Sequence, residues 1–437
     1  MSDVLVRGGL VVGVDGAERA DVLVRDGVLA DRGPSLDAPV GARVVDAADC
    51  WVGPGFVDLH THLREPGGEA AETIESGARA AAIGGYSLIV AMANTEPAID
   101  SAALVEYVLS RGSRARVEVA VMGAITVGRR GESLAPMAEM AALGVRLFSD
   151  DGIGVQDPAV MRRALLYASA LGVRLAEHCE DERLVAGGSM NEGALSSRLG
   201  LVGRPAMAEE LMVLRDIELA RWTGAAIHFL HLSTARSLAM VAAARREGLD
   251  VTSEVAPHHF TLDESACVDF DPLFKVNPPL RRAEDAAALR EALVRGEVDA
   301  VATDHAPHPP ESKDLPFDEA PAGVLGLEHA ASLTYEALGS QQCDPRRFFD
   351  LLSRGPARVA RVRPEDPRPR HGGHGGALRL GDDANVVVFD PGARWVVDRD
   401  QLHGRSRNTP YHGRAMHGRV RATIARGVLV ADDGELT

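Results

Sequence analysis

The sequence predicts an α/β fold, a (β/α)8 barrel of the TIM type with a small composite β-sandwich domain formed by both chain ends. Short apolar runs alternate with helical patterns eight times along the middle of the chain, as the strands and outer helices of such a barrel do. Glycine-bounded β-rich runs recur at both ends. An open doubly wound sheet is the alternative, but no Gly-x-Gly-x-x-Gly turn follows the first predicted strand.

The two β-rich ends flank a middle part in which strand and helix patterns alternate. This arrangement predicts one small domain built from both termini. The predicted composite domain takes residues 1–52 and 375–437, and the predicted barrel takes residues 53–374. The β-rich runs behind this prediction are residues 4–9, 22–27, 384–390 and 421–427. A connector rich in proline and glycine, residues 363–376, joins the two parts. We interpret its His371 and His374 as loop residues rather than metal ligands.

The middle of the chain supplies the eight predicted barrel strands and the helices between them. The predicted strands are residues 56–60, 87–91, 117–122, 145–148, 173–176, 227–231, 250–255 and 299–303. Helical patterns between them cover residues 72–83, 158–171, 209–222 and 283–295. Because side chains alternate along a strand but repeat about every 3.6 residues in a helix, the two patterns can be told apart.

Composition and charge narrow the range of functions that the chain could have. The chain has 437 residues, 46% of them hydrophobic, and a net charge of −16, which argues against nucleic acid and acidic membrane surfaces as partners. No apolar run approaches the roughly 18 residues needed to span a bilayer, and the first residues lack the pattern of a signal peptide. Four scattered cysteines form no CxxC pair. We therefore expect a cytoplasmic enzyme with a small-molecule substrate.

Reactive residue types gather where the predicted strands end. His60 and His62 leave the first strand on the same side, because side chains alternate along a strand, and two imidazoles can hold one metal ion. Further candidates follow other strands: Asp151, His178, His231 and Asp304. Each alone has a structural explanation, such as a turn residue, a core histidine or a helix cap. Together, these histidines and carboxylates at one end of a barrel predict a metal site.

The ligand types favour Zn²⁺, with Mn²⁺ or Co²⁺ as substitutes, because imidazoles and carboxylates are present without thiolates. The six candidates exceed the three or four protein ligands of a single zinc site. We therefore predict two ions that share a bridging carboxylate and a bridging hydroxide.

Segments in matching order over nearly the whole chain carry a family resemblance. They are His60-Thr61-His62-Leu63-Arg64-Glu65-Pro66-Gly67, Met92-Ala93-Asn94-Thr95-Glu96-Pro97, Phe148-Ser149-Asp150-Asp151-Gly152, His231-Leu232-Ser233-Thr234, Pro257-His258-His259, Lys275-Val276-Asn277-Pro278-Pro279-Leu280-Arg281, Ala302-Thr303-Asp304-His305-Ala306-Pro307-His308 and Arg407-Asn408-Thr409-Pro410-Tyr411. The chain resembles the amidohydrolase superfamily, and within it the dihydroorotases of the longer bacterial class, closest to the actinobacterial type. The Leu-Arg-Glu-Pro-Gly extension is much more specific than a His-x-His pair.

The resemblance implies roles for the six candidate ligands. It assigns them to two ions bridged by Asp151, with His60, His62 and Asp304 on one ion and His178 and His231 on the other. Many amidohydrolases, including hydantoinases and allantoinases, bridge instead with a carbamylated lysine after the fourth strand. The two lysines of this chain, Lys275 and Lys313, lie far downstream, which argues against those relatives.

The resemblance also implies the substrate contacts. Arg64, Asn94 and His308 would surround the carboxylate of dihydroorotate, and Asn277 would lie near its ring. The further implied substrate-binding residues are His62, Ala322 and Gly323. A guanidinium suits a carboxylate because it offers paired donors. Relatives often have Pro-Phe-Gly where this chain has Pro321-Ala322-Gly323. If only the backbone contacts the substrate, the change to Ala322 is harmless; if the aromatic ring packs on the substrate, affinity falls.

The implied activity is zinc-dependent, reversible hydrolysis of the cyclic amide of (S)-dihydroorotate to N-carbamoyl-L-aspartate, the third step of de novo pyrimidine (UMP) synthesis. Asp304 would accept the proton of the attacking water and return it to the leaving nitrogen. Residues 308–321, rich in Pro, Glu and Asp, would form a mobile lid. The alternatives are another cyclic amidohydrolase, of hydantoinase or allantoinase type, and a non-catalytic partner of aspartate transcarbamoylase. The partner hypotheses are a homodimer and association with aspartate transcarbamoylase.

Overall fold

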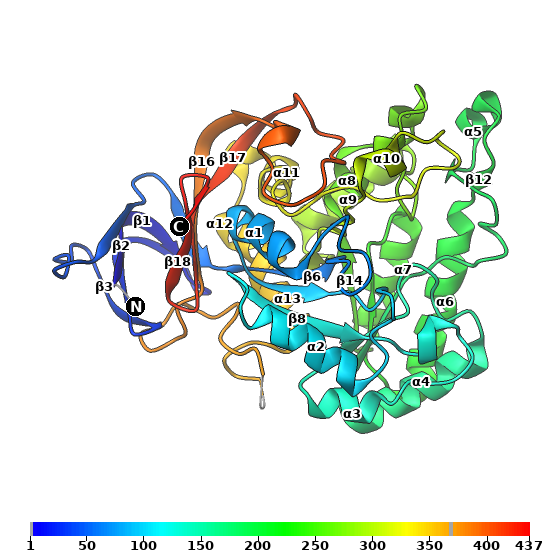
Figure 1. Ribbon diagram of the computed structural model, residues 1–437, viewed down its shortest axis with the longest axis horizontal. Helices are drawn as coiled ribbons and strands as arrows, with labels where there is room; N and C mark the ends of the chain where they lie inside the picture. The colour runs from blue at the N-terminus through cyan, green and yellow to red at the C-terminus, as the bar shows by residue number, and fades with distance from the viewer. Residues whose placement is uncertain (1–2, 367–369) are drawn as a thin grey trace.

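The computed structural model describes residues 3–366 and 370–437 and is centred on a barrel of eight parallel strands (Figure 1). In order around the barrel they are β6 (Phe56–Thr61), β7 (Tyr86–Ala91), β8 (Glu118–Gly123), β9 (Leu147–Phe148), β10 (Arg174–Glu177), β13 (Ile227–Phe229), β14 (Val251–Val255) and β15 (Ala300–Val301). All eight predicted strands are confirmed, with small shifts in their bounds. The barrel closes where Thr61 pairs with His305 and where the Thr303 amide donates to Asp58 Oδ1 at 3.0 Å. This closure excludes the open doubly wound sheet.

Helices connect the strands and cover the outside of the barrel (Figure 1). The four predicted helices are confirmed as α1 (Ile74–Gly84), α4 (Pro158–Leu171), α6 (Ala206–Thr223) and α9 (Ala283–Arg295). Helix α4 begins where Asp157 accepts two backbone amides, and it ends at Gly172, whose φ of 67° favours glycine. The other α-helices are α2 (Ala102–Gly112), α3 (Met137–Ala142), α5 (Ala194–Leu199), α7 (Ala235–Arg246), α8 (Pro257–Thr261), α10 (Pro310–Lys313), α11 (Ala330–Ala337), α12 (Pro345–Phe349) and α13 (Gly355–Ala360). Over the described ranges, none of the helices has both the length and the apolar character needed to cross a membrane.

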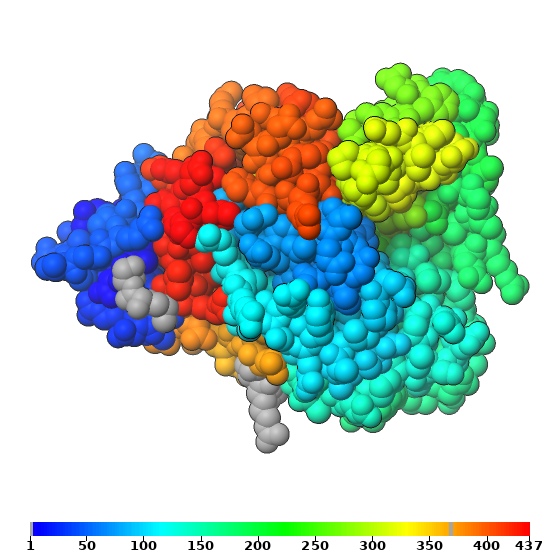
Figure 2. Space-filling view, in the orientation of Figure 1, coloured from blue at the N-terminus to red at the C-terminus, as the bar shows by residue number. Residues whose placement is uncertain are grey.

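Both chain ends form a second sheet beside the barrel, as predicted, with the order β19-β18-β17-β16-β5-β1-β2-β3 and β4 paired to β1. Its strands are β1 (Val4–Val12), β2 (Ala17–Arg25), β3 (Val28–Gly33), β4 (Arg43–Asp46), β5 (Trp51–Pro54), β16 (Val386–Val396), β17 (Ala415–Ala425), β18 (Val428–Asp432) and β19 (Glu435–Leu436). The ends join where Val388 lies opposite Val52, and Val22 and Ile424 belong to one buried cluster. The blue and red ends lie together on one side of the molecule (Figure 2). The domain boundaries at 52/53 and 374/375 stay a prediction.

Residues 367–369 of the predicted connector lie outside the described residues. The described part of the connector contacts the amino end of the barrel through His374. The buried ring of His374 contacts Ser87 Oγ through Nδ1 at 3.0 Å and Glu118 Oε2 through Nε2. Burial alone would raise the pKa of Glu118, but the hydrogen bonds and charges of His371 and His374 lower it from 4.5 to about 2. The ionised carboxylate therefore stabilises the fold above pH 4.5, and this contribution is lost as the pH falls toward 2.

Glu118→Gln is expected to lower the free energy of unfolding at pH 7 by about 1–3 kcal/mol, because the charge-assisted hydrogen bonds are lost. The difference from the unsubstituted chain should shrink below pH 4.5, where the carboxyl of the unfolded chain takes up a proton. Thermal unfolding followed between pH 7 and pH 3 measures this, with the exposed Glu106→Gln on α2 as control. A loss that stays constant over that range would contradict the role of the charge.

Candidate metal centre and cavity

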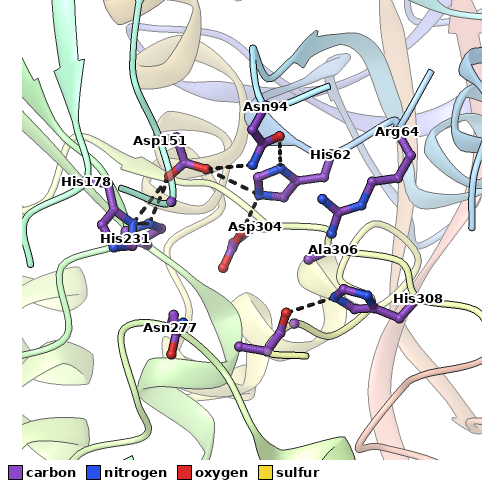
Figure 3. A pocket seen from close by; sticks show the side chains of 13 residues that line it. His62, Arg64, Asn94, Asp151, His178, His231, Asn277, Asp304, Ala306 and His308 are labelled. Atoms are coloured by element: carbon purple, nitrogen blue, oxygen red, sulfur yellow. Dashed lines mark hydrogen bonds and ion pairs between the residues drawn. The ribbon is translucent and has the colours of Figure 1, made fainter. Parts of the chain in front are cut away.

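A cavity of about 170 Å³ opens at the carboxyl end of the barrel (Figure 3). Its lining residues are His62, Arg64, Asn94, Asp151, Gly152, His178, His231, Asn277, Asp304, Ala306, His308, Ala322 and Gly323. The structure therefore brings all of the predicted substrate contacts, and all of the predicted metal ligands except His60, together around one cavity. His60 is fully buried, and its Nε2 lies 3.5 Å from Asp151 Oδ2.

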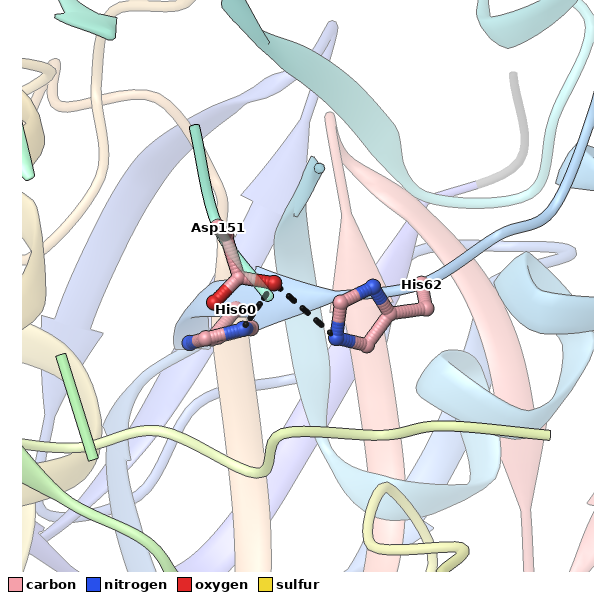
Figure 4. A group of neighbouring side chains, drawn as sticks. All are labelled: His60, His62 and Asp151. Carbon is pink, nitrogen blue, oxygen red and sulfur yellow. Dashed lines mark ion pairs between the residues drawn. The ribbon is translucent and has the colours of Figure 1, made fainter. Parts of the chain in front are cut away.

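Asp151 stands between two pairs of histidines. Its Oδ2 lies 3.5 Å from His60 Nε2 and 3.6 Å from His62 Nε2 (Figure 4). Its Oδ1 lies 3.4 Å from both His178 Nδ1 and His231 Nε2. Two ligand atoms bound at about 2.0–2.2 Å to one tetrahedral ion lie roughly 3.3–3.6 Å apart. Each pair of histidines, with Asp151 shared, could therefore hold one ion.

Hydrogen bonds behind the histidines fix which ring nitrogen faces Asp151. Three histidines direct their other nitrogen to an oxygen acceptor: His60 Nδ1 to Glu254 Oε1 at 2.9 Å, His62 Nδ1 to Asn94 Oδ1 at 2.8 Å, and His178 Nε2 to Glu180 Oε2 at 3.1 Å. An ionised carboxylate only accepts hydrogen bonds. Despite burial, the hydrogen bonds from His228 and His60 lower the pKa of Glu254 to about 2. The ionised Glu254 therefore requires a proton on His60 Nδ1, and Nε2 is the nitrogen that faces Asp151 and could bind a metal ion.

Unpaired polar atoms mark the same place. His60 Nε2 and Asp151 Oδ1 are buried and have no hydrogen-bond partner. Two ring nitrogens, His178 Nδ1 and His231 Nε2, face each other at 3.0 Å. Buried polar atoms of this kind are costly unless something binds them. Cations bound in the two groups that share Asp151 would satisfy these atoms, so this donor set fits metal ions.

Asp304 lies beside the first pair of histidines. Its Oδ1 is 3.1 Å from His62 Nε2 and 3.5 Å from His60 Nε2, while its Oδ2 is 3.9 Å from His258 Nε2. Burial would raise the pKa of Asp304, but the hydrogen bond from His62 and the charge of His60 lower it. Asp304 has a φ of 47° and His231 a φ of 29°, conformations that are rare for residues other than glycine and that concentrate at functional sites.

The opposite wall carries the cationic part of the cavity (Figure 3). Arg64 Nε donates to the Pro307 carbonyl at 3.3 Å, and in the described residues no carboxylate lies within 4.0 Å of its guanidinium. Burial and the charge of Arg64 lower the pKa of His308 to about 3, so the ring is neutral at pH 7. Its Nε2–H donates to the Ala322 carbonyl at 2.8 Å. In the predicted lid, Lys313 Nζ donates to the Pro321 carbonyl at 2.7 Å within the segment and to the Pro272 carbonyl outside it at 3.0 Å.

Sequence reasoning missed several residues that support the site. Glu254 lies inside the predicted strand 250–255, and Glu180 follows His178 by two residues. Neither position in the sequence indicates that the glutamate accepts a hydrogen bond from a histidine of the site. Asn408 belongs to a segment that carried the resemblance, and its Nδ2 donates to the carbonyls of Ala306 and Gly323. Arg204 lies outside the barrel pattern, and nothing in the sequence near it indicated a role.

A barrel with histidines and a shared carboxylate at its carboxyl end defines the class of the protein, a metal-dependent amidohydrolase. Residues 51–237 match the family model described as Dihydro-orotase-like. The relatives include dihydroorotases from Anaeromyxobacter dehalogenans, 46% identical over 99% of both chains, and from Mycobacterium tuberculosis, 45% identical over 99% of both. A third, from Streptomyces coelicolor, is 45% identical over 100% of both chains. The chain belongs to the dihydroorotase family.

Solved structures with the same fold carry a different name. L-hydantoinase (dihydropyrimidinase) from Arthrobacter aurescens has a TM-score of 0.88 and 24% identity, covering 100% of this chain and 98% of its own. D-hydantoinase (dihydropyrimidinase) from Thermus sp. has a TM-score of 0.83 and 26% identity, covering 99% and 96%. The fold is thus shared across the class, while the closer sequence identity lies with the dihydroorotases.

Proposed function

We propose that this chain catalyses the reversible hydrolysis of the cyclic amide of (S)-dihydroorotate to N-carbamoyl-L-aspartate, in pyrimidine synthesis. The observation that carries the proposal is the position of Arg64, which lines the same cavity as the Asp151 cluster and has no carboxylate partner among the described residues. A substrate with a carboxylate beside a ring amide would place its anion on Arg64 and its amide at the metal centre. An uncharged hydantoin would leave the guanidinium without an anionic partner, which costs free energy in a half-buried site.

We propose Zn²⁺ as the metal, two ions per chain, because the donor set contains imidazoles and carboxylates without a thiolate. His60, His62 and Asp304 would hold one ion, His178 and His231 the other, with Asp151 between them. Bound zinc would supply Lewis acidity toward the ring carbonyl and lower the pKa of water to about 7. Mn²⁺ or Co²⁺ are the other metals that this donor set accommodates.

The residues of the chain have distinct proposed roles. Arg64 binds the substrate carboxylate through its paired N–H groups, with Asn94 Nδ2 as a further donor. His308 would contribute only if its ring turned or gained a proton, because its present N–H donates to Ala322. Asp304 accepts the proton of the attacking water and returns it to the leaving nitrogen, a role that requires the carboxylate to be ionised at neutral pH. The segment 308–321 excludes water.

The proposal is tested with the purified chain loaded with zinc. We expect dihydroorotate to open to N-carbamoyl-L-aspartate at alkaline pH and the reverse ring closure at lower pH. Failure of both directions in a metal-loaded sample would refute it. Turnover of hydantoin or dihydrouracil at a comparable rate would favour the hydantoinase alternative, and absence of bound metal would favour the non-catalytic alternative.

Arg64→Met is expected to raise KM for dihydroorotate by about 10–100-fold, because a charge-assisted hydrogen-bonding pair with the carboxylate is lost. Metal content should stay unchanged, since Arg64 contacts none of the proposed ligands by a hydrogen bond in the described structure. Steady-state kinetics with metal analysis checks this, and the exposed Arg114→Met is the matched control. An unchanged KM would remove Arg64 from the carboxylate site.

A cytoplasmic location is proposed on the family membership alone. The partner hypotheses of a homodimer and of association with aspartate transcarbamoylase likewise remain proposals. Analytical ultracentrifugation of the chain alone, and then with purified aspartate transcarbamoylase, separates them.

A further inference from the structure

Arg204 lies in the segment that connects β10 to α6, residues 178–205. We call this segment the excursion; through Arg204 it contacts a residue that lines the cavity. The excursion contains the short paired strands β11 (Met190–Asn191) and β12 (Gly203–Arg204), and Arg204 is the last residue of β12. Its Nη1 donates to Asn277 Oδ1, and its Nη2 lies 3.2 Å from Glu180 Oε2. One guanidinium thus contacts both a residue that lines the cavity and the carboxylate behind His178.

The contact with Arg204 decides which way the Asn277 amide points. A guanidinium carries only donors, so the atom of Asn277 that faces Arg204 must be the oxygen. The NH₂ group of Asn277 is then turned away from Arg204, and in the described parts of the chain it has no protein acceptor. Because Asn277 lines the cavity, its free N–H groups are available to a ligand there. Asn277 and Arg64 lie on opposite sides of the cavity (Figure 3).

Arg204 is itself held in place. Its side chain is only 14% exposed, and its carbonyl accepts a hydrogen bond from Arg281 Nη1 at 2.8 Å. Arg281 Nη1 also donates to Asn191 Oδ1 at 3.1 Å, which ties β12 to β11. A Cβ added at Gly188 would lie 2.4 Å from Arg204 Cγ, so the stem of the arginine packs directly against that glycine. The guanidinium therefore has little freedom to leave Asn277.

We propose that Arg204 is a positioning residue that fixes Asn277 as a hydrogen-bond donor to a carbonyl oxygen of the substrate ring. The inference rests on the proposed function, because it supposes a ring with a carbonyl in this cavity. It adds a specificity rule: with Oδ1 engaged by Arg204, Asn277 recognises an acceptor on the ring and rejects an N–H at that position. Arg204 and Asn277 then act as one unit, and removing either should remove the same interaction.

A double-mutant cycle tests this unit. Arg204→Met and Asn277→Ala are each expected to lower kcat/KM for dihydroorotate by about tenfold, the size of one hydrogen bond in a site of this kind. The double variant should be no worse than Asn277→Ala, because the oriented amide is already gone. Effects that multiply would show that Arg204 acts independently of Asn277 and would overturn the proposal. Equal kcat/KM in Arg204→Met and the unsubstituted chain would do the same.

Further variants separate this role from other effects. Arg204→Lys keeps a charge and a donor and should recover part of kcat/KM, and it also guards against a folding failure of Arg204→Met. Arg198→Met removes the same charge from an exposed position on α5 of the same excursion and should leave kcat/KM unchanged. Metal content of Arg204→Met should match the unsubstituted chain; loss of metal would place the effect on Glu180 and His178 and overturn the proposal. If the unsubstituted chain does not turn over dihydroorotate, the proposed function fails instead.

Discussion

Asp304→Asn is expected to lower kcat by about 10²–10⁴-fold, the contribution typical of a general acid–base residue. An amide cannot accept the proton of the attacking water, whereas the ionised carboxylate can. The low pKa of Asp304, caused by the hydrogen bond from His62 and the charge of His60 against the effect of burial, keeps it ionised at neutral pH. Asp304 Oδ1 faces His62, whereas Oδ2 lies on the side of His258, 3.9 Å from its Nε2, so ligation and proton transfer can use different atoms.

The comparison for this substitution is Asp299→Asn. Asp299 precedes β15, at the amino end of the barrel, where it pairs with Arg245 and Arg358, so its loss should affect stability rather than turnover. Rates of ring opening and closure, metal content and thermal unfolding are measured for both variants. If Asp304→Asn retained more than about a tenth of kcat with its metal bound, Asp304 would not be the base, since even weak general bases contribute more.

Asp151→Ala is expected to lose both ions and, with them, activity. Four imidazoles converge on this carboxylate, and it supplies much of the negative charge that would balance two divalent ions. Removing a residue that only supports a ligand costs about 10–100-fold in metal affinity, and a shared ligand should cost more. Among the residues that the structure describes, Asp151 supplies the one carboxylate that lies between His178 and His231.

Metal per chain, measured after dialysis against a weak chelator, checks the Asp151 prediction. The control is Asp157→Asn, at the start of α4, because asparagine also caps a helix and this position lies outside the cavity. Retention of two ions by Asp151→Ala would mean that Asp151 does not bridge. Retention of one ion would show that the two pairs of histidines bind metal independently.

Much of the barrel could be predicted because its signals are local. The apolar run at 56–60 corresponds to β6 and the helical pattern at 158–171 corresponds to α4; each pattern is set by residues that are neighbours in the sequence. The gathering of His62, Asp151 and Asp304 could also be predicted, because each follows a strand and the carboxyl ends of parallel strands meet at one end of a barrel. The mobility predicted for residues 308–321 stays a prediction; the structure gives one conformation of that segment.

The sequence by itself determined the order of strands and helices, the union of the two chain ends in one β unit and the set of histidines and carboxylates at the cavity. Only the tertiary structure decided what supports them. His60 and Glu254 are 194 residues apart, and Arg204 meets Asn277 across 73 residues. Such contacts depend on how the barrel closes and on the rotamers of the buried side chains, which no short stretch of sequence encodes. Hydrogen bonds between distant residues therefore fix the orientation of the site, while local patterns fix its location.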